Sequence, residues 1–291
     1  MHRNALATLM TVGKIGVLGA GQMGAGIAQV ASCSGYTVTM VDIDENTVDR
    51  GMDSIQSSLQ RIVSKGRMEL KDSEAAMDLI TLSTDRSDFS DCDLVVEAIP
   101  EILQLKLEVF TELDAICHED TILATNTSSI SIDSIAKATN RPDRVIGMHF
   151  MNPVPIMKLV EVINGPETLA AVTEAVISVA GSMGKVPLLC NDSPGFVSNR
   201  ILCPMINEAI LTLEEGVAEP EAIDGIMKLG MNHPIGPLAL ADLIGLDTVL
   251  HIMRVLHEGF GNDKYEPASL LVSMVAKGNL GRKTGKGFFD Y

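Results

Sequence analysis

Apolar and polar stretches alternate along the first two thirds of the chain in a way that predicts strands and helices in turn. Short apolar or β-branched runs predict strands at 15–18 and 37–41, joined by a small-residue helical segment at 25–34. A polar helical region follows at 45–65, and a second helix is predicted around 72–80. Further strands are predicted at 94–98, 121–125, 145–150 and 158–163. This alternation favours an open, mostly parallel sheet in which the last two strands turn antiparallel.

The pattern changes after Cys190. A loop at 191–195 leads into helical periodicity at 196–213, and little strand pattern follows. Pro220 and Gly230 have the Pro-first, Gly-last arrangement of a helix, and another helix is predicted from Pro237 to about His257. We therefore expect an α/β chain with two domains: a Rossmann-type, doubly wound domain over 1–190, of which 1–13 form an extension, and an all-helical substrate and dimerisation domain over 191–291.

Composition narrows the classes of partner. A 291-residue chain that is 46% hydrophobic is globular and long enough for two cores. Its formal charge of −16 argues against nucleic acid or an anionic membrane as the main partner. The five cysteines are scattered without a CxxC pair, so we expect a reducing compartment and no metal site. The cytoplasm is the predicted location, or the mitochondrial matrix or peroxisome in a eukaryote.

A glycine-rich turn follows the first predicted strand. Gly19, Gly21 and Gly24 form a GxGxxG pattern that opens a helix. Asp42 ends the next strand, 23 residues after the first glycine. In this context the glycines allow a tight turn and close approach of a pyrophosphate, and the carboxylate accepts the ribose hydroxyls. The same carboxylate would repel a 2′-phosphate, so the pattern predicts NAD in preference to NADP.

Two ionisable side chains interrupt the apolar strands at 145–150 and 158–163. His149 and Glu161 are equidistant from Pro155 in the turn, so a hairpin folded there would place them opposite each other. Such a pair is either a structural ion pair or a general base held by a carboxylate. These strands alone leave the two interpretations evenly balanced.

Other candidates are weaker. Residues 126–129 (Asn-Thr-Ser-Ser) follow a strand and could face a ligand crevice, but locally a helix N-cap before Ile130 is favoured. Asn199 lies on an amphipathic segment and resembles a surface residue. For a polyanionic ligand, the basic candidates are the isolated Lys106 and the group Arg61, Lys65 and Arg67, for which a solvated helix end is the better interpretation without further context.

Several motifs together resemble the L-3-hydroxyacyl-CoA dehydrogenase family, most of all its short-chain 3-hydroxybutyryl-CoA members. The similarity runs from Lys14 to Tyr291, and the residues before it have no family counterpart. Pro100 stands where the family commonly has Val. The motifs are GAGQMGAGIAQ (19–29), DLVVEAIPE (93–101), NTSSISI (126–132), HFMNPVPIMKLVEVI (149–163), DSPGFVSNRIL (192–202), NHPIGPLALADLIGLD (232–247) and GRKTGKGFFDY (281–291).

The resemblance implies roles for individual residues. His149 would be the catalytic base and Glu161 its partner, while Ser128 and Asn199 would contact the substrate. Cofactor contacts are implied for Gly19, Gly21, Gln22, Met23, Gly24, Asp42, Glu101, Lys106, Asn126 and Ser128. Contacts with the acyl-CoA substrate are implied for Ser58, Lys65, Ser128, Asn152 and Asn199.

The resemblance also implies the reaction. NAD would oxidise a short (S)-3-hydroxyacyl-CoA to the 3-oxoacyl-CoA, and a homodimer would form through the C-terminal helices. Two alternatives remain: a related NAD-dependent 3-hydroxyacid dehydrogenase acting on a free sugar acid, and a non-catalytic NAD-binding homologue.

Overall fold

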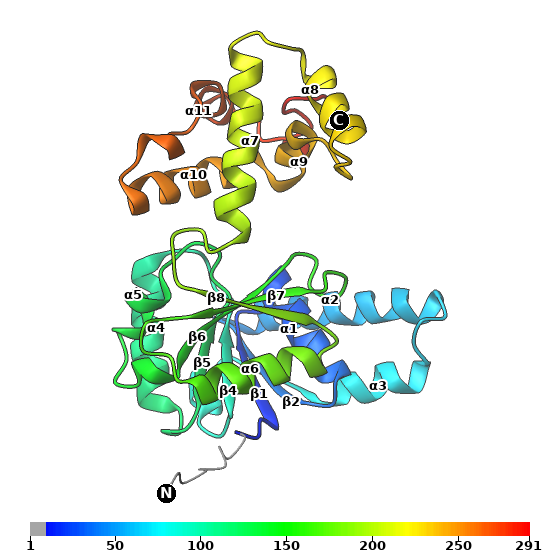
Figure 1. The fold of residues 1–291 in the computed structure, drawn as a ribbon. Helices are drawn as coiled ribbons and strands as arrows, with labels where there is room; N and C mark the ends of the chain where they lie inside the picture. Colours follow the sequence, from blue (N-terminus) through cyan, green and yellow to red (C-terminus); the bar gives the residue numbers. More distant parts are fainter. Residues whose placement is uncertain (1–9) are drawn as a thin grey trace, which may run out of the picture. The chain divides into compact units, whose positions relative to one another are not determined.

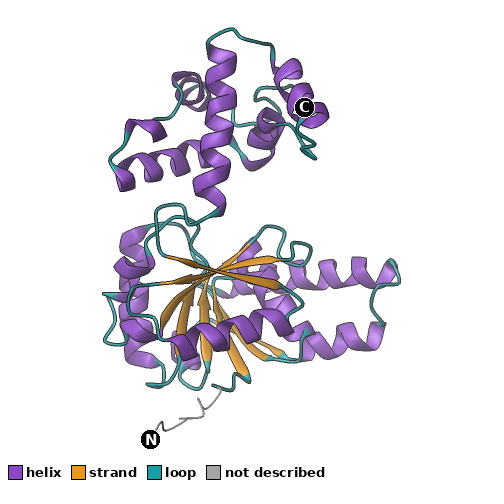
Figure 2. Cartoon of the chain, in the orientation of Figure 1, coloured by secondary structure: helices purple, strands orange, loops and turns teal. Residues whose placement is uncertain are grey.

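The computed structural model describes residues 10–291, and the chain forms two compact units, the first ending at Asp192 and the second beginning at Ser193 (Figure 1). The extension expected at 1–13 falls mostly outside the described residues. The first unit is an α/β sheet structure and the second is helical (Figure 2). The division lies two residues beyond the expected one. No helix in the described part is long and apolar enough to cross a membrane.

An eight-stranded sheet forms the centre of the first unit, in the order β3-β2-β1-β4-β5-β6-β7-β8. All neighbouring strands pair in parallel except β6 and β7, which are antiparallel as predicted. The chain reverses direction across the sheet at β1, whose neighbours are β2 and β4. Such a switch point opens a crevice at the carboxyl ends of the strands. The strands are β1 (Lys14–Leu18), β2 (Thr37–Val41), β3 (Ile80–Ser83), β4 (Leu94–Glu97), β5 (Ile122–Thr125), β6 (Val145–Phe150), β7 (Leu159–Asn164) and β8 (Val186–Asn191).

Helices cover both faces of this sheet. Alternate strand residues such as Leu94 and Val96 share one hydrophobic core with helices α1, α2 and α6. The residue between them, Val95, is buried outside that core, and α4 and α5 pack together on the other face. The sheet is therefore doubly wound, as predicted. Its helices are α1 (Gln22–Cys33), α2 (Glu45–Ser64), α3 (Leu70–Asp78), α4 (Leu103–Ile116), α5 (Ile132–Ala136) and α6 (Ala170–Ser182).

The second unit has a core of its own, built from apolar faces of its helices. Buried Asp242 ties the C-terminal residues to this core, because it accepts hydrogen bonds from the backbone of Phe288 and Phe289 and from the Tyr291 hydroxyl. Its helices are α7 (Ser198–Glu214), α8 (Pro220–Gly230), α9 (Pro237–Ile244), α10 (Leu246–Phe260) and α11 (Ser269–Ala276).

Three elements differ from the sequence expectation. The helix predicted from Pro237 is two helices, because Gly245 between them has φ +103°, which ends α9. Strands β3 and β8 were missed. Both are edge strands with partly exposed residues, and β8 contains Pro187, which an edge strand tolerates. The β3 sequence (ITLS) alternates apolar and polar residues over only four positions, and the apolar run of β8 (VPLLCN) contains a proline, which counts against a strand.

Candidate active site

The glycine-rich turn lies at the carboxyl end of β1. Gly19 has φ +104°, a conformation that disfavours any side chain. A Cβ on Gly24 would stand 1.7 Å from the carbonyl oxygen of Gly19, whereas a Cβ on Gly21 would meet nothing within 4 Å. Gly24 therefore packs directly against Gly19, whereas the space beside Gly21 is open. In the GxGxxG motif this is where the pyrophosphate approaches the backbone.

The start of α1 and the end of β2 complete a dinucleotide cradle. Helix α1 begins at Gln22 and Met23, and its N-cap residue Gly21 contributes no side-chain cap. Amide groups at such a helix start bind phosphate. Asp42 is held in place, since its Oδ2 accepts from the Ala20 amide at 2.6 Å and its Oδ1 from the Ile43 amide at 2.7 Å. The residues present fit an NAD molecule.

His149 and Glu161 face each other across β6 and β7, which confirms the predicted register. The Nδ1 atom of His149 lies 2.8 Å from Oε2 of Glu161, and the two residues are only 8% and 4% exposed. A carboxylate can only accept, so Nδ1 carries the hydrogen and Nε2 is the basic nitrogen of the neutral ring. Low exposure strengthens the interaction because water does not screen it.

The loop after β5 is held by Glu101. One oxygen, Oε1, accepts from the Thr127 hydroxyl at 2.6 Å and from the backbone amides of Ser128 and Ser129 at 2.9 and 3.0 Å. Burial alone would raise the pKa of Glu101, but the charge of Lys106 and these hydrogen bonds lower it below its usual value. Glu101 is thus ionised at neutral pH and orders the loop that carries Ser128.

The N-cap expected before Ile130 was wrong. Helix α5 begins at Ile132, and Ser131 is its cap, accepting from the Ser134 amide. The hydroxyls of Ser128 and Ser129 instead donate to Oε1 of Glu101, at 3.3 and 2.9 Å. A distant carboxylate, which local sequence does not reveal, decides this arrangement. In the same loop the Oδ1 atom of Asn126 accepts from the backbone amide at the end of β6.

Lys106 is not a surface cation for a polyanion. Its side chain is buried on α4 and pairs with Glu97, and its ammonium lies 3.5 Å from Glu101. Sequence reasoning missed Glu97, although it is the last residue of an apolar strand and His149 is the last residue but one of another. An ionisable residue in such a strand was the signal that singled out His149, and the same signal marks Glu97.

A cavity of about 580 Å³ lies beside the glycine turn, between α1, α2 and the turn after β6. Lys65 and Ser58 of the α2 region line it together with Asn152 of the turn, so the structure brings these three predicted substrate residues together. The remaining basic residues of the α2 group, Arg61 and Arg67, line it as well. Three cations on one cavity make it suited to an anionic ligand, in contrast to the solvated helix end favoured by local sequence.

Lys185 fixes the wall of this cavity and was not predicted. Its buried ammonium donates to the carbonyl oxygens of Val154 and Met157, the latter at 2.9 Å. Burial lowers the pKa of Lys185. Asn199 lies in the first turn of α7, in the second unit, and its contact with a substrate stays a prediction.

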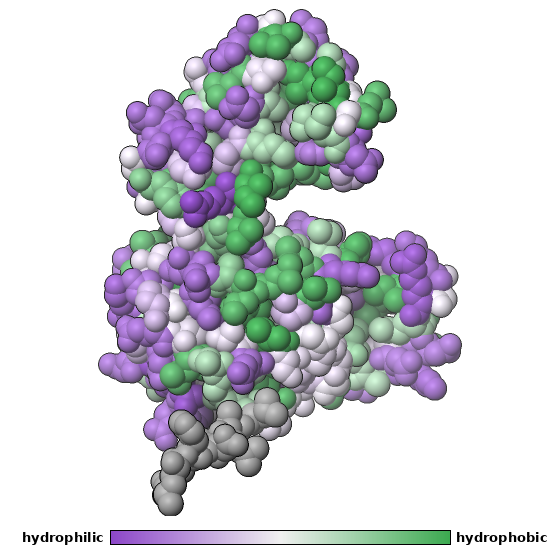
Figure 3. All heavy atoms as spheres, in the orientation of Figure 1, coloured by the Kyte–Doolittle hydropathy of each residue, from purple (hydrophilic) through white to green (hydrophobic). Residues whose placement is uncertain are grey.

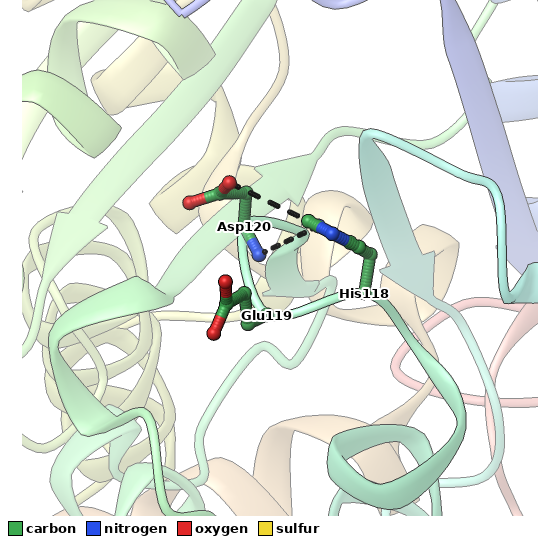
Figure 4. Close-up of side chains that lie close together, drawn as sticks. All are labelled: His118, Glu119 and Asp120. Atoms are coloured by element: carbon green, nitrogen blue, oxygen red, sulfur yellow. Dashed lines mark hydrogen bonds and ion pairs between the residues drawn. The ribbon is translucent and has the colours of Figure 1, made fainter.

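One group of metal-binding residue types occurs in the described part of the chain. His118, Glu119 and Asp120 are consecutive, exposed residues in the turn before β5 (Figure 4). The Asp120 amide donates to Nδ1 of His118 at 3.2 Å, so hydrogen bonding within the turn accounts for their proximity. They lie at the amino ends of the strands, away from the glycine turn.

Comparison with known proteins gives these features a family. The model of the 3-hydroxyacyl-CoA dehydrogenase NAD-binding domain matches residues 14–193, and that of the C-terminal domain of the same enzymes matches residues 195–291. The chain belongs to the 3-hydroxyacyl-CoA dehydrogenase family. Members of this family share the NAD-binding domain that the fingerprint predicted, and the predicted resemblance is confirmed.

Individual family members are similar over almost their whole length. A probable 3-hydroxybutyryl-CoA dehydrogenase of Deinococcus radiodurans is 58% identical over 96% of this chain and 100% of its own. The human mitochondrial hydroxyacyl-coenzyme A dehydrogenase is 44% identical over 99% of this chain and 94% of its own. The crystal structure of (S)-3-hydroxybutyryl-CoA dehydrogenase from Ralstonia eutropha superposes with a TM-score of 0.95, at 50% identity over 97% of this chain and 99% of its own.

Proposed function

We propose that this dehydrogenase interconverts (S)-3-hydroxybutyryl-CoA and its 3-oxo form, using His149 as general base and acid. The observation that carries the proposal is the hydrogen bond between His149 and Glu161 at the carboxyl edge of the NAD-binding sheet. A buried imidazole oriented by a carboxylate is suited to take a hydroxyl proton. The names of the similar enzymes supply the substrate class.

Each proposed residue has a separate task. Nε2 of His149 takes the proton of the 3-hydroxyl, and Glu161 stabilises the imidazolium that forms. The Ser128 hydroxyl, in the loop ordered by Glu101, holds the same oxygen of the substrate. The glycine turn, the start of α1 and Asp42 would hold NAD, which would supply the acceptor for the hydride of carbon 3. Asn199, in the first turn of α7, is proposed as a further substrate contact.

The substrate class is tested by oxidation of NADH, followed at 340 nm. We expect turnover with acetoacetyl-CoA and a rate at least about 100-fold lower with free acetoacetate or a 3-oxo sugar acid, because remote binding energy is lost without CoA. Comparable activity on a free acid would instead select the sugar-acid alternative. Absence of turnover on all three, with NADH still bound, would select the non-catalytic alternative.

The cavity beside α2 is proposed to hold the phosphates of CoA. Lys65→Ala is expected to raise KM for acetoacetyl-CoA about tenfold, the effect of one lost charge-assisted contact, with little change in kcat. KM for acetoacetyl-pantetheine, which lacks the nucleotide, should be unchanged. Lys71→Ala, at an exposed lysine of α3 outside the cavity, is the control. An equal rise of KM with both thioesters would place the phosphates elsewhere.

A homodimer through the helical unit is also proposed. Ile226 and Leu229 of α8 and the following Met231 are 61%, 91% and 62% exposed, and hydrophobic atoms reach the surface of this unit in Figure 3. Apolar side chains gathered in this way are typical of an interface. We expect light scattering to give about twice the mass of one chain, and Leu229→Glu to shift the protein toward the monomer. A monomeric wild-type protein would contradict this proposal.

We propose a reducing compartment because the five cysteines are scattered along the chain and form no CxxC pair. Burial raises the pKa of the Cys92 and Cys203 thiols to about 12, so these side chains are inert core residues.

A further inference from the structure

Three charged side chains meet where β4 ends and α4 begins. Glu97 and Lys106 are 0% and 1% exposed, and the ammonium lies 2.5 Å from Oε1 of Glu97. The same ammonium is 3.5 Å from Glu101, whose side chain is one quarter exposed. Two carboxylates therefore share one cation in a largely buried place. Burial of charge is costly, so a group of this kind calls for an explanation beyond stability.

Glu97 is the best-connected member of the group. Besides Lys106, its Oε1 accepts from the Ile99 amide at 2.7 Å, and its Oε2 accepts from the Thr125 hydroxyl at 2.7 Å. It thus joins the end of β4 to the end of β5 and fixes the Lys106 side chain. A buried polar group with all its partners in place is rigid and has one geometry.

Lys106 connects Glu97 to Glu101. The ammonium is directed by Glu97 and by the carbonyl oxygen of Ile99 at 3.3 Å, so it stands at a fixed point beside Glu101. Glu101 in turn accepts from the amides of Ser128 and Ser129. Because it is fully buried, the Glu97 side chain contacts no ligand. Its Oε2 also holds the Thr125 hydroxyl, which accepts from the Thr127 amide at 3.2 Å, so Glu97 supports the loop that carries Ser128 from this side as well as through Lys106 and Glu101.

The charge of the group has a further consequence. Glu97 and Glu101 with Lys106 amount to one net negative charge beside the carboxyl ends of β4 and β5. In a doubly wound sheet the half that contains β1 and β2 binds the adenosine end of the dinucleotide, and the other half binds the nicotinamide end. The oxidised nicotinamide ring is a cation and the reduced ring is neutral. A net negative charge here favours the oxidised ring.

We propose that Glu97 is a positioning residue that acts through Lys106 on the Glu101 loop, and that its charge makes this group favour NAD⁺ over NADH. The proposal rests on NAD binding at the glycine turn and deepens the proposed function. Its test uses the cofactor without any substrate. The result therefore stays decisive even if the enzyme acts on a substrate other than the proposed thioester.

The experiment measures Kd for NAD⁺ and for NADH by calorimetry on the full chain. Glu97→Gln removes the net charge of the group, and we expect Kd for NAD⁺ to rise about tenfold while Kd for NADH changes less than about threefold. Glu97→Gln with Lys106→Met leaves Glu101 alone, restores one negative charge, and should return the ratio of the two constants to near the wild-type value. The control is Glu112→Gln, which removes an exposed carboxylate of α4, the helix that carries Lys106. This carboxylate pairs with Arg86, and its removal should change neither Kd.

A second variant and a second measurement test the proposal even if Glu97→Gln does not fold well enough for binding studies. Glu101→Gln makes the same charge change at a more exposed position and should lower the NAD⁺ preference about as much. In Glu97→Gln, amide hydrogen exchange at Ser128 and Ser129 should quicken, because their acceptor Glu101 is less well held. The proposal is overturned if both single variants shift the two constants equally or leave them unchanged. It is likewise overturned if exchange in this loop stays at the wild-type rate in a folded Glu97→Gln protein.

Discussion

His149→Gln is expected to lower kcat for acetoacetyl-CoA reduction by about 10³-fold, the usual contribution of a positioned acid–base group. Gln retains polarity and approximate size, so the hairpin of β6 and β7 should keep its register. It has no titratable nitrogen, and proton transfer to or from the substrate oxygen is lost. NADH binding, measured by calorimetry, should remain within about threefold of the wild type, since the glycine turn is untouched.

Two further variants make this result specific. His118→Gln changes an exposed histidine in the turn before β5, at the amino ends of the strands, and should leave kcat unchanged. Glu161→Gln retains the imidazole but loses the charge that stabilises its protonated form. A hydrogen bond to a charged group contributes about 1.5–3 kcal/mol, so kcat should fall about 10- to 100-fold. Near-normal turnover of His149→Gln would show that another group moves the proton.

Gly24→Ala is expected to weaken NAD⁺ binding about 10- to 100-fold and to lower the melting temperature. The new Cβ would stand 1.7 Å from Gly19 O and 2.8 Å from the carbonyl carbon, both rigid backbone atoms. Relief of such overpacking costs about 1–3 kcal/mol, and the turn that moves is the one that receives the pyrophosphate. Calorimetry and thermal unfolding measure the two effects.

Alanine substitutions at two other glycines distinguish an effect on NAD⁺ binding from an effect on stability. Gly21→Ala meets no protein atom within 4 Å and has φ −67° at that position, so the fold should be unaffected while the pyrophosphate loses its close approach. Gly181→Ala, in α6, also has open space and should alter neither quantity by much. If Gly24→Ala bound NAD⁺ like Gly181→Ala, the interpretation of the turn as the cofactor cradle would fail.

Local pattern predicted those features that depend on near neighbours in the chain. The central strands and α8 have the predicted type and nearly the predicted bounds, because apolar runs and Pro and Gly signals act within a few residues. The pairing of His149 with Glu161 followed from the symmetry of one hairpin. Edge strand β3 is short and only alternately apolar, and edge strand β8 contains Pro187, so local pattern did not reveal them.

The sequence by itself determined the doubly wound fold, the NAD fingerprint, the family and the opposition of His149 to Glu161. These follow from short-range spacing and from motifs. Tertiary structure alone revealed that Glu101 orders the Ser128 loop, that Lys106 is buried against Glu97, and that Lys65 lines a cavity with Asn152. Such contacts join segments far apart in the chain, and a side chain's partners there depend on how strands and helices pack, which no local pattern records.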